Sequence, residues 1–505
     1  MSKTRLMAGA AVVGLALAGV GQARAETLAD AIALAYQSNP TLQGQRAQQR
    51  ALDETYVQAR AGYRPTLSAS GSMGYQYSQH GLIDANTGSV ALSASQPIYT
   101  GGRVSAAVSA AEAQVLAGRE GLRAVEAQVL QAVIQAYQDV RRDLTILGIR
   151  EKNVEVLSNQ LQQTQVRFEV GQVTRTDVAQ AEAQVAASRA LLAGAQAQLQ
   201  ISRAAYATVV GQNPGALADS PPLPGLPATV DLAFEAADNG NGNLRRARLA
   251  EVSSRARIAQ ARAAGHPTAA ISASLGYSGP ISPFDTRDYS RNVTIQGVVS
   301  QPLFTGGLVQ SGVRQALEQN TADRIAIEGV RRQVVQAVSQ AWNVMGSTRA
   351  SMTANAEQVR AATVAFTGIQ EQYQVGISTI LDVLVAQTTL RDAELFLAQS
   401  THDYYVAQAS LLNAMGRLEA GALVSGSPLY DATANFNQVK IAGTVPWEGL
   451  VRDFDAVGAP SPTAAVSPIP APAAPTGAVA MIPAPAPPAK LDPSTTLPIG
   501  RAPDR

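Results

Sequence analysis

The sequence predicts an α+β membrane protein in which long coiled-coil helical hairpins alternate with short β-hairpins. Three observations support this fold class. A corner motif occurs twice, as SQPIYTGG at residues 95–102 and as SQPLFTGG at residues 300–307. Long proline-free stretches carry apolar residues every three or four positions, and shorter stretches between them alternate with a period of two.

The second half of the chain repeats the first. From the corner onward, matching residues are 205 apart, as in QAVIQAY at residues 131–137 and QAVSQAW at 336–342. Upstream the offset is 202, as for Pro65 and Pro267, so the difference of three falls in a surface turn between Tyr75 and Gln96. We therefore expect two structural repeats of one unit.

The expected organisation follows from this duplication and from changes in composition. The predicted segments are a signal peptide at 1–25, repeat 1 at 26–211, a Pro/Gly-rich linker at 212–229, repeat 2 at 230–416, an equatorial segment at 417–457 and a Pro/Ala-rich disordered tail at 458–505.

Each repeat is expected to contain one very long helix. Residues 104–168 lack proline and show coiled-coil spacing, which at ~1.5 Å per residue predicts a rod of roughly 100 Å. A second arm, residues 177–210, returns after a turn and is about half as long. We expect a helix at 41–62 to stack end to end on this arm and cover the remaining length of the first. The same reasoning applies in the second half to residues 309–375, 382–415 and 243–264.

The period changes to two in four stretches. Apolar residues alternate with serines in TLSASGSMGYQY and SVALSASQPIY, and the second half repeats this pattern. Each repeat is thus predicted to hold one β-hairpin, at about 66–98 and 268–302, with strands of about ten residues, the length that a tilted membrane strand needs. A soluble two-sided hairpin is the alternative.

The repeated corner is expected to turn a strand directly into a helix. Pro97 cannot donate a ladder hydrogen bond, and Gly101 and Gly102 can adopt backbone angles that are closed to other residues. The equivalent residues of the second half are Pro302, Gly306 and Gly307.

The N-terminal residues have the pattern of a Sec-type signal peptide with cleavage before Glu26. A short membrane anchor is the alternative. Losing Lys3, Arg5 and Arg24 takes the formal charge from +1 to −2, which removes any basic bias toward nucleic acid. The chain has no cysteine, which excludes disulfides and a lipid-modified N-terminal cysteine. After residue 20 no long uncharged apolar stretch occurs, so a membrane role would have to use strands.

Four strands cannot bury their own edges, so copies of the chain must share one barrel in lipid. Up to about Gly416, the chain resembles the TolC family of outer-membrane efflux and type I secretion channels. The paired corners carry the resemblance, together with the turns RFEVGQVTRTDVAQAEAQ and QYQVGISTILDVLVAQTTL. It implies a homotrimer whose strands close into a 12-stranded β-barrel in the outer membrane, continued by a periplasmic α-helical barrel.

The resemblance also implies the partners. They are a periplasmic adaptor protein, an inner-membrane transporter driven by ATP or protons, and outer-membrane lipid. The expected function is an exit duct that passes proteins or small toxic compounds from the transporter to the outside, and the sequence does not identify the cargo. A periplasmic coiled-coil adaptor or scaffold is the alternative, which would not need lipid-facing strands.

The resemblance assigns functional residues at the two helical turns. Thr176, Asp177 and Tyr373 match gate-linking residues, and Asp382 matches the inner of two aspartates that constrict the pore. A ring of symmetry-related carboxylates favours cations. The tips expected to contact the adaptor comprise Val170, Gly171, Val375 and Gly376, with both valines packed under the turn.

Two positions depart from the family pattern. The second constricting aspartate is Val385 here, and the arginine expected to pair with the first hairpin's aspartate is Ser378. Arg175 is a possible substitute. For Asp177 and Asp382, helix N-capping is an equally weighted alternative, and capping is compatible with a place in the pore.

No catalytic constellation is recognised. The histidines, His80, His266 and His402, are scattered, and no nucleophile elbow precedes a helix. We therefore expect no enzyme activity, no metal site and no cofactor.

Overall fold

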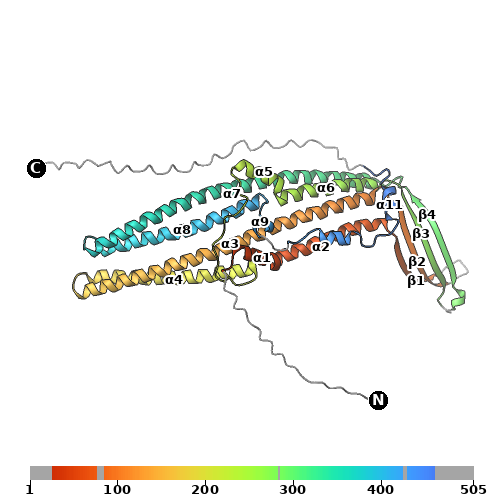
Figure 1. Cartoon of the computed structure of the whole chain (residues 1–505). Helices are drawn as coiled ribbons and strands as arrows, with labels where there is room; N and C mark the ends of the chain where they lie inside the picture. Colours follow the sequence, from red (N-terminus) through yellow and green to blue (C-terminus); the bar gives the residue numbers. More distant parts are fainter. Residues whose placement is uncertain (1–24, 77–84, 282–284, 425–428, 461–505) are drawn as a thin grey trace, which may run out of the picture.

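In a computed structural model, the chain folds into long, nearly parallel helices with a β-sheet at one end (Figure 1). The structure describes residues 25–76, 85–281, 285–424 and 429–460. Most of the expected signal peptide, nearly all of the expected tail, His80 and part of the turn expected between Tyr75 and Gln96 lie outside these ranges. None of the described helices is both long and apolar enough to cross a membrane.

The elements of the first half follow in this order: α1 (Leu28–Ser38), α2 (Pro40–Arg60), the 3₁₀ helix η1 (Ala61–Tyr63), β1 (Thr66–Gln76), β2 (Ala85–Tyr99), α3 (Arg103–Glu169) and α4 (Arg175–Val210). Those of the second half are α5 (Val230–Gly240), α6 (Gly242–Ala263), β3 (Thr268–Pro280), the 3₁₀ helix η2 (Thr286–Asp288), β4 (Ser290–Ser300), α7 (Leu308–Gln374) and α8 (Ile380–Ala414). The short helices α9 (Ala420–Leu423), α10 (Ala434–Val439) and α11 (Glu448–Asp455) end the described chain.

The short helices stack end to end as expected. Asn39 caps α2 through its Oδ1 and donates from Nδ2 to the carbonyl of Val209 in the last turn of α4, at 2.9 Å. Asn241 repeats this arrangement, since it caps α6 and donates to the carbonyl of Ala414 in α8, at 2.9 Å. One amide side chain thus joins two helix ends in each half, and the composite helix spans the length of its long partner.

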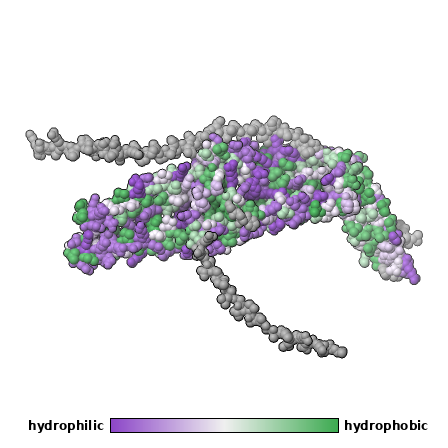
Figure 2. Space-filling model, in the orientation of Figure 1, coloured by the Kyte–Doolittle hydropathy of each residue, from purple (hydrophilic) through white to green (hydrophobic). Residues whose placement is uncertain are grey.

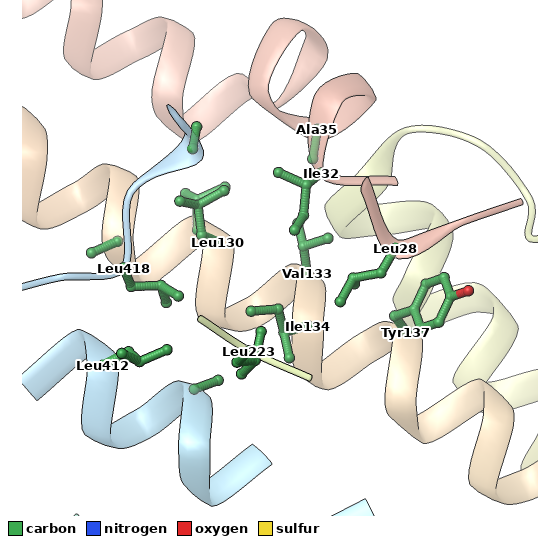
Figure 3. Close-up of a cluster of buried hydrophobic side chains, with 14 of the residues drawn as sticks. Leu28, Ile32, Ala35, Leu130, Val133, Ile134, Tyr137, Leu223, Leu412 and Leu418 are labelled. Carbon is green, nitrogen blue, oxygen red and sulfur yellow. The ribbon is translucent and has the colours of Figure 1, made fainter. Parts of the chain in front are cut away.

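The core lies where these helix ends meet. Figure 3 shows Leu130, Val133 and Ile134 of α3 gathered with Leu28 and Ile32 of α1. Side chains from the linker, from α8 and from the segment after α8 complete this cluster, among them Leu223, Leu412 and Leu418. The middle of the shaft is therefore the best-packed part of the chain.

The four strands form one antiparallel sheet in the order β1-β2-β3-β4. Directly paired residues share a face, and the register aligns the apolar residues of all four strands on one side. This apolar face consists mainly of Leu67, Met73, Tyr75, Val90, Leu92, Ile271, Leu275, Tyr277, Val293, Ile295 and Val299. Serines dominate the opposite face. The alternation seen in the sequence is thus a property of the whole sheet.

The two corners use left-handed glycines as expected, with φ of 67° and 81° at Gly101 and Gly102 and of 60° and 89° at Gly306 and Gly307. The strand ends differ from the prediction. Pro97 lies inside β2, which continues past a bulge to Tyr99 because it still pairs with β3. β4 is an edge strand in the chain and already ends at Ser300, before Pro302.

Candidate functional site at the tips of the helical hairpins

The turns of the two helical hairpins lie at the end of the shaft opposite the sheet (Figure 1). Gly171 and Gly376 reverse the chain with φ of 76° and 80°. A Cβ at either position would meet no atom within 4 Å. The left-handed backbone angle, and not crowding, is therefore the reason for glycine at both tips.

The valines beside these glycines do not pack under the turns, and this prediction was wrong. Val170 is 66% exposed and Val375 is 71% exposed. Ile377 is exposed next to them. A turn of five residues has no interior of its own, so these apolar side chains point into solvent.

Both aspartates cap the helices that follow the turns. The backbone N–H of Thr174 donates to Asp177 Oδ2 at 2.7 Å, and the N–H of Asp177 donates to Thr174 Oγ1 at 3.3 Å. Thr379 and Asp382 form the same reciprocal capping box, with distances of 2.9 and 3.3 Å. The capping alternative is thus confirmed for both residues, and their role in a pore stays a prediction.

The capping box leaves Asp382 exposed and charged. Hydrogen bonds from the Thr379 hydroxyl and backbone N–H hold the pKa of the Asp382 carboxyl below its ordinary value. Both bonds are accepted by Oδ2, and no described residue donates to Oδ1. Asp382 can therefore cap α8 and still present a negative oxygen to an ion.

Tyr373 joins the two hairpins. Its ring is buried, and the guanidinium carbon of Arg167 on α3 lies 4.5 Å from the ring centroid. Tyr373 also belongs to an apolar cluster that contains Leu157 of α3 and Val185 of α4. Ile380, Val383 and Leu384 of α8 complete this cluster. Sequence reasoning missed Arg167, because a cation over a ring leaves no trace in local periodicity.

The other predicted gate residues are not brought together within one chain. Arg175 and Thr176 are exposed, and no ion pair among the described residues includes Arg175. The hydroxyl of Ser378 donates to Gln372 Oε1 at 2.9 Å, which closes its own turn. Val385 is exposed. A substitution of the missing arginine by Arg175 therefore stays a prediction.

A second link between the hairpins lies further up the shaft and was not predicted. His402 of α8 is buried between two carboxylates, with Nε2 2.9 Å from Asp139 Oδ1 and Nδ1 2.9 Å from Asp403 Oδ1. Arg142 pairs with Asp139 on the α3 side at 3.0 Å. Burial lowers the pKa of His402, but the two carboxylates outweigh it and raise the pKa overall. The ion pair connects α3 to α8.

The sequence is similar to outer membrane efflux proteins over most of its length. The sequence model of the family described as outer membrane efflux protein matches the chain twice, at residues 31–212 and 234–417. The outer membrane efflux protein BepC of Brucella suis is 34% identical over 425 residues, which cover 83% of this chain and 92% of BepC. The outer membrane protein TolC of Escherichia coli is 28% identical, covering 89% of this chain and 94% of TolC.

A solved structure shares the fold of this chain. The crystal structure of the outer membrane protein VceC from Vibrio cholerae superposes with a TM-score of 0.65 at 22% identity, covering 77% of this chain and 96% of VceC. The arrangement of strands and helical hairpins is therefore shared. Because the family model matches most of both halves, this chain belongs to the outer membrane efflux protein family.

Proposed function

We propose that this chain supplies one sector of an exit duct, which carries cargo from an inner-membrane transporter and a periplasmic adaptor across the outer membrane. The single observation that carries this proposal is the sheet, whose apolar residues share one face and whose strands continue directly into the helical shaft. An apolar sheet face can contact lipid, and a continuous helical shaft can extend through the periplasm.

Three copies would complete the duct. Within the chain β1 and β4 each have one neighbour, and unpaired backbone groups of an edge strand are costly in lipid. Pairing β4 of one copy with β1 of the next would satisfy these groups, and three copies would close a barrel of twelve strands. Each chain would then contribute both of its helical hairpins to the tube below.

At the tips, we infer that Asp382 of three copies forms a ring of negative charge. Its exposure, its free Oδ1 and its lowered pKa support this placement. Val385, one helical turn further on, would make the adjoining constriction apolar. The Arg167–Tyr373 stack would hold the two hairpins of one copy together in the closed state.

The exposed tips are the expected docking site of the adaptor. Val170, Val375 and Ile377 present apolar side chains on both turns, beside the glycines that shape them. Exposed apolar patches of this kind mark contacts with other proteins. The cargo is either polypeptides or small toxic compounds, and a deletion strain tested for both protein secretion and drug sensitivity would identify it.

The duct is tested by fractionation and by size. The full-length protein should appear in the outer membrane, require detergent for extraction and run as a trimer. A water-soluble monomer in the periplasm would instead support the adaptor or scaffold alternative.

The charge ring is tested by Asp382→Asn. Asp382 is the N3 residue of the capping box, and an asparagine Oδ1 can accept the same bond from the Thr379 N–H, so the variant removes the charge and keeps that bond. We expect block of the channel by divalent cations in planar bilayers to weaken at least several-fold. Asp30→Asn is the matched control, because Asp30 closes the same kind of capping box with Thr27 at the start of α1, away from the tips. Equal block in wild type and Asp382→Asn would remove Asp382 from the constriction.

The adaptor contact is tested by Gly376→Val and Gly171→Val. A β-branched residue at positive φ should distort the tip, while the trimer, held by sheet and shaft, persists. We expect loss of adaptor crosslinking and of export in cells. Normal export by both variants would contradict the docking site.

A further inference from the structure

The helix α11 turns two carboxylates toward the protein. Glu448 and Asp455 are 3% and 0% exposed, and with Val451 they form the inner stripe of the helix. A helix on a water-soluble surface normally turns its apolar side to the core and its charges outward. In α11 two carboxylates face the protein, and four apolar side chains are exposed on the outer side beside the exposed Arg452–Asp453 ion pair. The surroundings of these apolar side chains therefore need an explanation.

The inner carboxylates are fully paired, which determines how the helix is rotated. Glu448 accepts from Nε of Arg60 at 2.9 Å and from Nε of Arg64 at 3.0 Å. Asp455 accepts from the backbone N–H groups of Thr100 at 2.5 Å and Gly102 at 3.2 Å, at the start of α3. These bonds stabilise α11 against the first corner without using apolar burial.

The outer stripe is apolar and continuous. It consists of Trp447, Leu450, Phe454 and Val457, which follow one another at steps of three and four along one side of the helix. All four side chains are exposed, Leu450 to 76% and Val457 to 67%. A stripe of this kind costs free energy in water, because its apolar area stays hydrated.

The helix lies on the apolar side of the sheet. Trp447 Nε1 donates to Gln96 Oε1 at 3.0 Å, and Gln96 shares the apolar face because it is paired with Ile271. The Phe454 ring packs edge-on against Tyr99, with 5.8 Å between the centroids. The bulge in β2 brings Tyr99 opposite Ala269, on the same face. Figure 1 shows α11 at the junction of the sheet with the shaft, where the green surface of Figure 2 begins.

We propose that α11 is an interfacial membrane helix, which places its outer stripe in the periplasmic leaflet of the outer membrane. Apolar helix faces in such sites insert about 5–10 Å into the boundary between headgroups and acyl chains, and tryptophan is enriched there. The outer stripe continues the lipid-facing side of the sheet. Phospholipid is therefore the occupant, and α11 fixes the depth of the duct in the membrane.

A second copy of the chain fits this stripe less well. Neighbouring copies would pair through the edge strands β1 and β4, whereas α11 packs on the inner strand β2 and on η1. The stripe also faces the same side as the sheet residues that lipid must cover.

The test is quenching of Trp447 fluorescence by brominated phospholipids. The described chain has a second tryptophan, Trp342, buried in the shaft on α7. The full-length Trp342→Phe variant, reconstituted in vesicles, isolates Trp447. Since the indole should sit at the interface, lipids brominated near the headgroup should reduce its emission roughly twofold and more than lipids brominated at the chain end. Acrylamide in the water phase should quench it weakly.

Two controls keep the outcome decisive. Trp447→Phe leaves Trp342 as the remaining tryptophan, and brominated lipid should not quench its fluorescence. If Trp342→Phe folds poorly, the difference in quenching between wild type and Trp447→Phe still reports on Trp447. Ile295→Trp in the variant without either native tryptophan places an indole on the apolar face of β4, where lipid should quench it.

The inference rests on the proposed placement of the sheet in the outer membrane, and the controls separate the two. Quenching at position 295 without quenching of Trp447 overturns the interfacial helix and keeps the membrane-embedded sheet. No quenching at either position overturns both. Strong acrylamide quenching of Trp447 would place the stripe in water, and protection from both quenchers would place a protein partner on it; either result refutes the proposal.

Discussion

The two halves of the chain have matching elements and unequal environments. The helices α3 and α7 both have 67 residues and both follow a pair of left-handed glycines. Yet α3 buries 24 of its residues and α7 only 7. The reason is position: α3 packs against α4, α6, α2 and α8, while α7 lies at the flank of the chain. In the proposed trimer, the exposed side of α7 would face a neighbouring copy of the chain.

The corners show the same contrast. The first corner is covered by α11, whose Asp455 binds its backbone N–H groups. At the second corner no described segment takes this place, and Leu303 is 93% exposed with Phe304 beside it. A repeat in sequence thus does not produce a repeat in packing, because the C-terminal segment exists once per chain and binds one corner.

The largest expected effect is at the covered corner. Asp455→Ala leaves buried N–H groups without an acceptor and should destabilise the folded protein by about 2–4 kcal/mol. Thr305→Val is the control at the second corner, where the equivalent threonine has no side-chain hydrogen bond within the described residues, and it should change stability by less than about 0.5 kcal/mol. Thermal unfolding of the detergent-solubilised protein measures both. Equal losses would show that the corners are equivalent after all.

A smaller effect, equal in both halves, is expected at the helix junctions. Asn39→Ala and Asn241→Ala each remove an N-cap and the bond to the last turn of α4 or α8, and each should cost about 1–2 kcal/mol. The same unfolding measurement applies. A loss confined to one variant would mean that only one composite helix depends on its junction.

The smallest effect expected is a pH dependence of the link between the hairpins. The pKa of His402 is raised in the folded state. The contribution of its charged form to the free energy of unfolding is therefore complete below the ordinary histidine pKa, and it is lost as the pH rises through the raised pKa. The unfolding temperature of wild type should therefore fall from mildly acidic to mildly alkaline pH more steeply than that of His402→Gln. Parallel pH profiles of the two proteins would exclude His402 as the source.

Much of the candidate site could be predicted from the sequence. Asp177 and Asp382 each stand three residues after a threonine at the start of an apolar run, and the structure shows the resulting capping boxes. The glycines of the tips were predicted for the same local reason. The exposure of Val170 and the stack of Arg167 on Tyr373 were not, since both depend on how separate hairpins meet.

Local sequence patterns were enough to predict the long rods, the strands and the positive φ of the corner glycines. An apolar residue at every second position, or at every third or fourth, can be recognised within a short stretch of sequence. Among the amino acids, only glycine adopts a positive φ at low energetic cost. Three features could be recognised only in the folded chain. They are the deeper burial of α3 than of α7, the ion pairs of His402 and the inward-facing carboxylates of α11. Each depends on residues up to several hundred positions apart, and which face of a helix is buried is decided by the neighbours that arrive there.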